Sequence, residues 1–116
     1  LVAELTAFYL GVTRPNGVAM VGAMLQEAAD EHLRRLYRER VVAPRRSRIR
    51  HILGRAVQLG VAAPDADVDY AVAACTGTLY ALHLAGRPLT RDWPQRTATL
   101  VWRAIGGRSL GGTAAS

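Results

Sequence analysis

The stretch YAVAACTGTLYALHLAG, from Tyr70 to Gly86, contains no formally charged residue. Asp65, Asp67 and Asp69 precede it and can cap a helix, and the turn residues that follow Gly86 can end one. The helix would be apolar nearly all round, and such a helix in a small domain has to be covered on both sides. The few other helices of one short chain cover only one side well. The sequence therefore predicts that a second copy of the chain covers the other.

The same stretch does not predict a membrane span. A span needs about twenty strongly apolar residues, whereas this helix is rich in alanine and contains His83, two threonines and two glycines. We therefore expect no membrane partner. The chain has no signal-peptide pattern at its start, and its single Cys75 cannot form an internal disulfide. The expected location is the cytoplasm.

Helical periodicity extends toward the start of the chain. One predicted helix has its apolar face at Leu1, Leu5, Phe8, Tyr9 and Val12. Pro15-Asn16-Gly17 would end it, and residues 18–28 form a second short amphipathic stretch. Asp30 can cap the next helix. The sequence leaves open whether residues 31–60 form one helix kinked at Pro44 or two abutting helices.

Thr90 or Asp92 is expected to cap the last helix, and Gly106-Gly107 to end it. Its apolar face would consist of Trp93, Thr97, Leu100, Val101, Ala104 and Ile105. No strand pattern and no internal repeat occurs in the sequence. The predicted fold class is all-α, an antiparallel helical domain of about five to six helices. The domain would comprise residues 1–107, followed by a flexible tail at 108–116.

Positive charge is concentrated in one part of the chain. The 116 residues are 50% apolar and 21% charged, which excludes a disordered or collagen-like protein, and their net charge is +6. Nine arginines lie between Arg34 and Arg55, where Glu39 is the only acid, so this band carries +8 and the rest of the chain −2. A solvated helix face is the favoured interpretation. The alternative function is a small basic helical adaptor or nucleic-acid-binding module that uses the Arg34–Arg55 band.

Few motifs carry catalytic or metal-binding chemistry. The Asp-x-Asp-x-Asp motif at 65–69 resembles the start of a calcium loop, but Tyr70 and Thr76 stand where glycine and glutamate are needed. Its acids are better explained by the positive end of a helix. Cys75 and His83 lie about two helical turns apart, which does not make a nucleophile pair, and no serine lies in a nucleophile-elbow motif. We expect no enzyme activity, no metal and no cofactor.

Two sets of residues are candidates for binding. An apolar ligand cavity combines large apolar, sulfur-containing and polar-tipped side chains, and the pocket candidates of this kind are Phe8, Met20, Met24, Tyr37, Tyr80 and His83. Ordinary core packing is the alternative for each of them taken singly. The candidates for the interface with a second chain are Val72, Cys75, Leu79, Leu82, Trp93, Thr97, Leu100, Val101 and Ile105. Leu79→Arg or Leu100→Arg would then place an unpaired charge in the interface and dissociate the dimer.

Several segments taken together resemble one protein family. They are RERVVAPRR at 38–46, ILGRAV at 52–57, DADVD at 65–69, GTLY at 77–80, AGRPL at 85–89 and LVWRAI at 100–105. Their order and spacing are similar to those of the C-terminal ligand-binding and dimerisation domain of TetR-family transcriptional regulators, over residues 1–106. The resemblance implies that the last two helices pair with those of a second subunit in a four-helix bundle. It also implies a small, usually apolar effector among the central helices that releases the operator.

The chain departs from the family at its amino-terminal side, where the helix-turn-helix is missing. Gly77-Thr78-Leu79-Tyr80 resembles part of a TetR recognition helix, but it lies within an uncharged helix and lacks adjacent phosphate contacts. Because the chain also begins without Met, we expect a piece of a longer repressor. Its expected partners are a second copy, an unknown small hydrophobic effector and, only through the missing head, operator DNA. The helix from Leu1 to Val12 would join this domain to the missing DNA-binding domain and transmit the movement between them.

Overall fold

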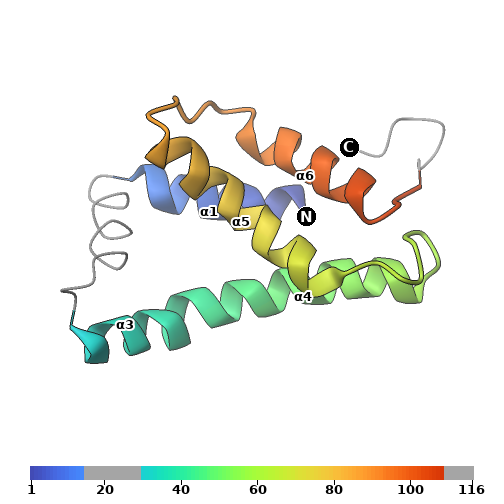
Figure 1. Cartoon of the computed structure of the whole chain (residues 1–116), viewed down its shortest axis with the longest axis horizontal. Helices are drawn as coiled ribbons and strands as arrows, with labels where there is room; N and C mark the ends of the chain where they lie inside the picture. Colours follow the sequence, from blue (N-terminus) through green and yellow to red (C-terminus); the bar gives the residue numbers. More distant parts are fainter. Residues whose placement is uncertain (15–29, 109–116) are drawn as a thin grey trace.

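The computed structural model describes residues 1–14 and 30–108 (Figure 1). The elements in chain order are α1 (Val2–Thr13), α3 (Glu31–Tyr37), the π-helical turn η1 (Arg38–Val42), α4 (Ala43–Gln58), α5 (Val68–Leu84) and α6 (Trp93–Ala104). The predicted all-α class is confirmed, because these two ranges contain helices and no strand. The helix expected at 18–28, the stop at 15–17 and the tail from 109 onward lie outside the described residues. The predicted number of helices is therefore not tested.

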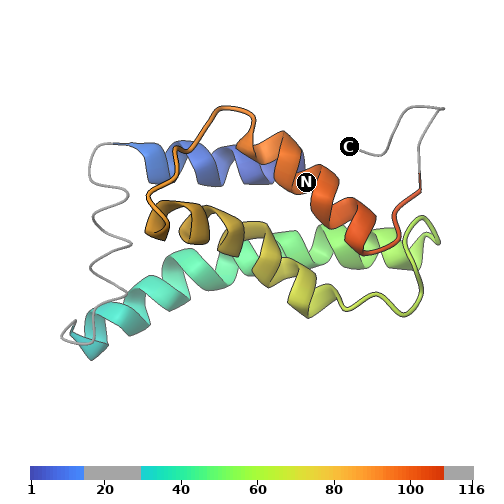
Figure 2. The same cartoon turned by 45° about the horizontal axis from the view of Figure 1, so that its top comes forward.

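α3, η1 and α4 form one unbroken helical rod along one side of the molecule (Figures 1 and 2). The sequence left open whether this region forms one helix or two abutting helices, and the structure has one continuous helix. In the π-helical turn, the N–H of Ala43 donates to the carbonyl of Arg38, five residues earlier. Pro44 follows directly and lies in the first turn of α4. Because proline has no N–H and its ring clashes with the carbonyl four residues before it, the widened turn lets the helix continue through Pro44.

Capping side chains define where two of the helices begin. The Asp30 carboxylate accepts a hydrogen bond of 2.8 Å from the N–H of His32 and starts the rod. The Asp67 carboxylate accepts one of 3.1 Å from the N–H of Tyr70 and starts α5. The cap predicted at Asp30 is thus confirmed, and Asp67 has the capping role that we assigned to the acids of its motif. Asp92 is the N-cap residue of α6, although its side chain makes no capping hydrogen bond.

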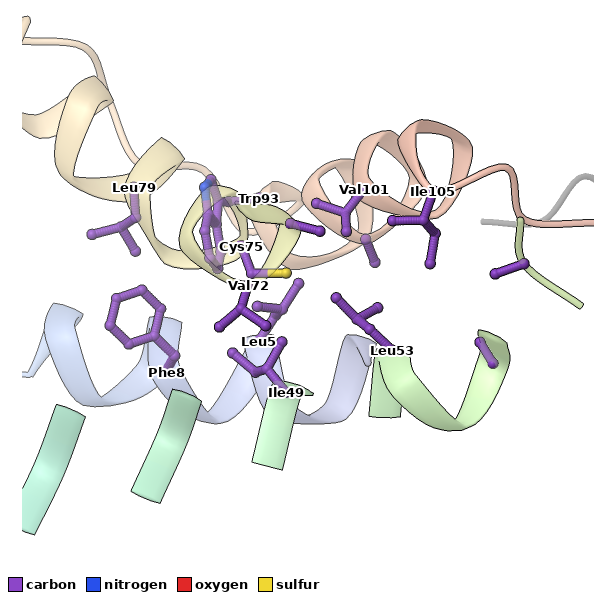
Figure 3. Close-up of a cluster of buried hydrophobic side chains, with 14 of the residues drawn as sticks. Leu5, Phe8, Ile49, Leu53, Val72, Cys75, Leu79, Trp93, Val101 and Ile105 are labelled. Atoms are coloured by element: carbon purple, nitrogen blue, oxygen red, sulfur yellow. The ribbon is translucent and has the colours of Figure 1, made fainter. Parts of the chain in front are cut away.

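The core lies where α1 and α4 meet α5 and α6 (Figure 3). α5 packs against both α4 and α6, and α1 packs against α6. The fully buried side chains of these four helices form one cluster, which includes Leu5, Phe8, Ile49, Leu53, Val72, Cys75, Leu79 and Val101. The predicted apolar face of the first helix is confirmed at its buried positions Leu5, Phe8 and Val12.

The face that α6 buries differs from the predicted one. Pro94 and Ala98 are buried with Trp93, Thr97, Val101 and Ile105, while Leu100 and Ala104 are exposed. Of the predicted face, Trp93, Thr97, Val101 and Ile105 are therefore buried within the chain, whereas Leu100 and Ala104 lie on its outer border. Residues on both borders of an apolar stripe look alike in sequence. The packing partner decides which border turns inward. Here the inner border meets α1 and α5, and the outer border remains on the surface of the chain.

Candidate functional site

Aromatic side chains from three helices meet at one end of the core. The Phe8 ring of α1 is only 1% exposed. It makes an edge contact with the Tyr80 ring of α5, with centroids 5.8 Å apart and planes at 84°. The Trp93 ring of α6 lies at the same centroid distance from Phe8, tilted by 58°. Such contacts are favourable beyond the apolar area that they bury.

A cation lies directly on this aromatic group. The guanidinium carbon of Arg45 is 4.6 Å from the centroid of the Phe8 ring, which is a cation–π contact. The Arg45 Nε is buried and has no hydrogen-bond partner among the described residues. Burial raises the pKa of the Tyr80 hydroxyl; nearby Tyr37 raises it further, and Arg45 lowers it. We refer to Phe8, Tyr37, Arg45 and Tyr80 as the Arg45 cluster.

A second feature is an open groove between α5 and α6, with a volume of about 890 Å³. Thr78 and Trp93 lie at its base, where the indole N–H of Trp93 donates to the Thr78 hydroxyl at 3.2 Å. Leu82 and Leu100 supply apolar area on its two sides. Leu100 is 59% exposed. The apolar side chains on both of its sides make the groove a candidate surface for contact with another molecule.

Comparison with known protein families identifies the family of the chain. A family model described as the tetracyclin repressor-like C-terminal domain matches residues 1–101. The chain belongs to this family. The predicted resemblance is therefore confirmed, and the family is one of ligand-binding and dimerisation domains of regulators. No curated protein and no solved structure gave a significant match.

The TetR-like domain brings together three of the residues predicted for a ligand pocket. Phe8 and Tyr80 are in direct contact, and Tyr37 is near enough to Tyr80 to raise the pKa of its hydroxyl. His83, in contrast, has an exposed side chain near the end of α5. The candidates Met20 and Met24 lie outside the described residues. Sequence analysis missed Arg45 itself, which it treated as part of a solvated band. Its spacing could have indicated that Arg45 faces the core, because Arg45 lies four and eight residues before the buried Ile49 and Leu53, on the same helix face.

The TetR-like domain uses most of the predicted interface residues in its own core. Seven of the nine have exposed fractions of 4% or less and so present little surface to a partner: Val72, Cys75, Leu79, Trp93, Thr97, Val101 and Ile105. The remaining two, Leu82 and Leu100, are the more exposed of the four predicted residues that line the α5–α6 groove; the nearly buried Trp93 and Thr97 are the other two. The periodicity of apolar residues predicts which positions are buried, but it does not show whether the same chain or a second chain buries them.

The basic band is divided between packing and solvent. Arg48 pairs with Glu4 of α1 at 2.6 Å, and Arg50 pairs with Asp69 of α5 at 2.7 Å. These two arginines therefore contact the helices on either side of the rod. Each pair is partly exposed, so each contributes only about 0–1 kcal/mol. The pairing reduces the charge that the band presents for binding nucleic acid.

Among the described residues, no group of three or more histidine, cysteine or acidic side chains is placed to hold a metal ion. Asp67 caps α5 and Asp69 binds Arg50, so two acids of the calcium-like motif have structural partners. No helix in ranges 1–14 and 30–108 has the length and apolar character needed to cross a membrane.

Cys75 lies on α5 with an exposed fraction of 0%, and burial raises the pKa of its thiol to about 11. The reactive species of cysteine is the thiolate. We therefore expect a thiol reagent at pH 8 to modify the folded protein about 100-fold more slowly than the protein unfolded in urea. Absorbance after addition of a disulfide reagent measures both rates. Equal rates in the two conditions would contradict the burial of Cys75.

Proposed function

We propose that this TetR-like domain senses a small ligand and forms a symmetric homodimer within a cytoplasmic bacterial repressor. The observation that carries the proposal is the family match over residues 1–101. Operator binding would belong to a DNA-binding head joined to α1, and the domain at 1–107 would bind effector and a second copy. It would have no enzymatic activity of its own.

The α5–α6 groove supports the choice of dimer surface. Leu100 and Leu82 contribute apolar area on its two sides, and Leu84 is also largely exposed at the end of α5. A stable interface buries about 800 Å² on each partner. Two copies related by a twofold axis would each place the same groove against the other, which joins two pairs of helices in one bundle.

The packing of α1 supports a route from the ligand to the head. α1 packs against α6 and also contacts α5, and its Phe8 touches both helices through Trp93 and Tyr80. A ligand that prefers one arrangement of these helices changes operator affinity by the difference in its own affinity for the two arrangements. Such coupling is typically about 1–3 kcal/mol.

The dimer is tested by Leu100→Arg. We expect the unmodified chain to be a dimer at micromolar concentration and Leu100→Arg to weaken dimerisation at least about 100-fold, because the guanidinium would be buried without a partner. Sedimentation equilibrium measures the dissociation constant. Leu59→Arg is the matched control, since Leu59 is 60% exposed but lies outside the groove. A monomeric unmodified chain, or equal effects of the two substitutions, would reject the proposed interface.

A further inference from the structure

The π-helical turn changes which residues of the rod share a face. In a regular helix of 3.6 residues per turn, Tyr37 and Arg45 are eight residues apart and would point about 80° away from each other. A π-type turn takes up about one extra residue, so the remaining rotation is within roughly 20° of two full turns. The turn at Arg38–Val42 lies between these two residues. It therefore brings Tyr37 and Arg45 toward one face, and π-type turns of this kind occur frequently at functional sites.

Arg45 differs from the two arginines of the rod that form ion pairs with neighbouring helices. Arg48 and Arg50 bind Glu4 and Asp69, whereas no acid among the described residues pairs with Arg45. Its Nε is buried and has no hydrogen-bond partner there, although its guanidinium lies on the Phe8 ring. A buried charged donor without an acceptor is unfavourable. An anion bound at this position would remove that penalty.

The surroundings of Arg45 indicate what kind of anion fits. Tyr37 and Tyr80 are half-buried phenols. Tyr80 packs on the same Phe8 ring that carries the guanidinium, and Tyr37 points toward the face of the rod that bears Arg45. Leu33 lies one turn before Tyr37 and is half exposed, which leaves apolar surface next to the Tyr37 ring. The site thus combines a planar cation, two hydroxyl donors and an apolar wall.

We propose that the Arg45 cluster binds the carboxylate of a small apolar carboxylic acid, which is the effector class of this domain. The Nε and one Nη of Arg45 would donate two parallel hydrogen bonds to the carboxylate, a geometry that a guanidinium matches and an ammonium does not. The hydroxyls of Tyr37 and Tyr80 donate to the same oxygens. The alkyl or aryl body lies against Tyr37 and Leu33. This inference rests on the proposed ligand-sensing function and names the chemistry of the ligand.

The test compares acids with uncharged amides of the same shape. The probes are octanoate and 3-phenylpropionate, with octanamide and 3-phenylpropionamide as their neutral counterparts, and calorimetric titration of the chain measures the affinities. We expect each acid to bind at least tenfold more tightly than its amide, because only the carboxylate completes the hydrogen bonds of Arg45. Amides that bind as tightly as the acids, or no binding of either acid at millimolar concentration, would overturn the proposal.

Variants assign the binding to this arginine. Arg45→Gln should lower the affinity for the acids at least tenfold and leave the affinity for the amides unchanged. Arg55→Gln is the matched control, because Arg55 is an exposed arginine of the same helix. Arg45→Lys keeps the charge but loses the planar pair of donors, so an intermediate loss is expected. Tyr80→Phe keeps the ring and should lower acid affinity severalfold. Equal effects of Arg45→Gln and Arg55→Gln would overturn the assignment.

Two further measurements keep the outcomes separate. Far-UV circular dichroism establishes that each variant is folded, and if Arg45→Gln does not fold, Arg45→Lys and Tyr80→Phe decide the question. Sedimentation of the same samples reports the dimer. A dimer that binds neither acid would overturn the ligand class alone, whereas a monomer that binds the acids through Arg45 would reject the proposed dimer and leave the ligand class intact.

Discussion

Phe8→Ala should lower the free energy of unfolding by about 3–5 kcal/mol. The Phe8 ring is 1% exposed, and it contacts Tyr80, Trp93 and the guanidinium of Arg45. Truncation removes the buried aromatic area, leaves a cavity between three helices and takes away the surface on which the cation lies. Urea denaturation followed by circular dichroism at 222 nm measures the change in the transition midpoint.

Two other substitutions on the same helix serve as controls for Phe8→Ala. Phe8→Leu keeps most of the buried volume and is expected to cost less than half as much as Phe8→Ala. Leu10→Ala changes a side chain that is 57% exposed and should alter stability by no more than about 0.5 kcal/mol. A loss for Phe8→Ala as small as that for Leu10→Ala would mean that α1 does not pack on the core as the structure describes.

Features that depend on a few neighbouring residues were predicted well from the sequence. The apolar face of α1 and the cap at Asp30 follow from spacing and from short-range hydrogen bonding, which the sequence contains directly. The TetR-like assignment rested on several segments in order, and the family match supports it over residues 1–101.

Features that depend on the partner of a helix face were not predicted. Leu100 was placed on the apolar face of the last helix and Ala98 was not, yet within the chain the structure exposes the first and buries the second. Arg45 was assigned to solvent because the arginines of the band are distributed around the helix, whereas the π-helical turn and Pro44 set its phase relative to Tyr37. A rotation of the helix by about one residue is enough to move a side chain from one face to the next. Hydrophobic patterns alone do not determine that rotation.

Leu79→Arg should prevent the chain from folding, whereas Leu100→Arg should leave the fold intact. Both positions were predicted to lie in an interface, but Leu79 is 1% exposed within the core of its own chain and Leu100 is 59% exposed. An unpaired guanidinium at position 79 would cost several kcal/mol, which is a large part of the roughly 5–15 kcal/mol that stabilises a domain. A thermal melt followed by circular dichroism should therefore lack a cooperative transition for Leu79→Arg and retain one for Leu100→Arg. If Leu79→Arg instead gave a folded monomer with an unchanged melting temperature, the face of α5 that bears Leu79 would be the dimer surface, and the groove beside Leu100 would not.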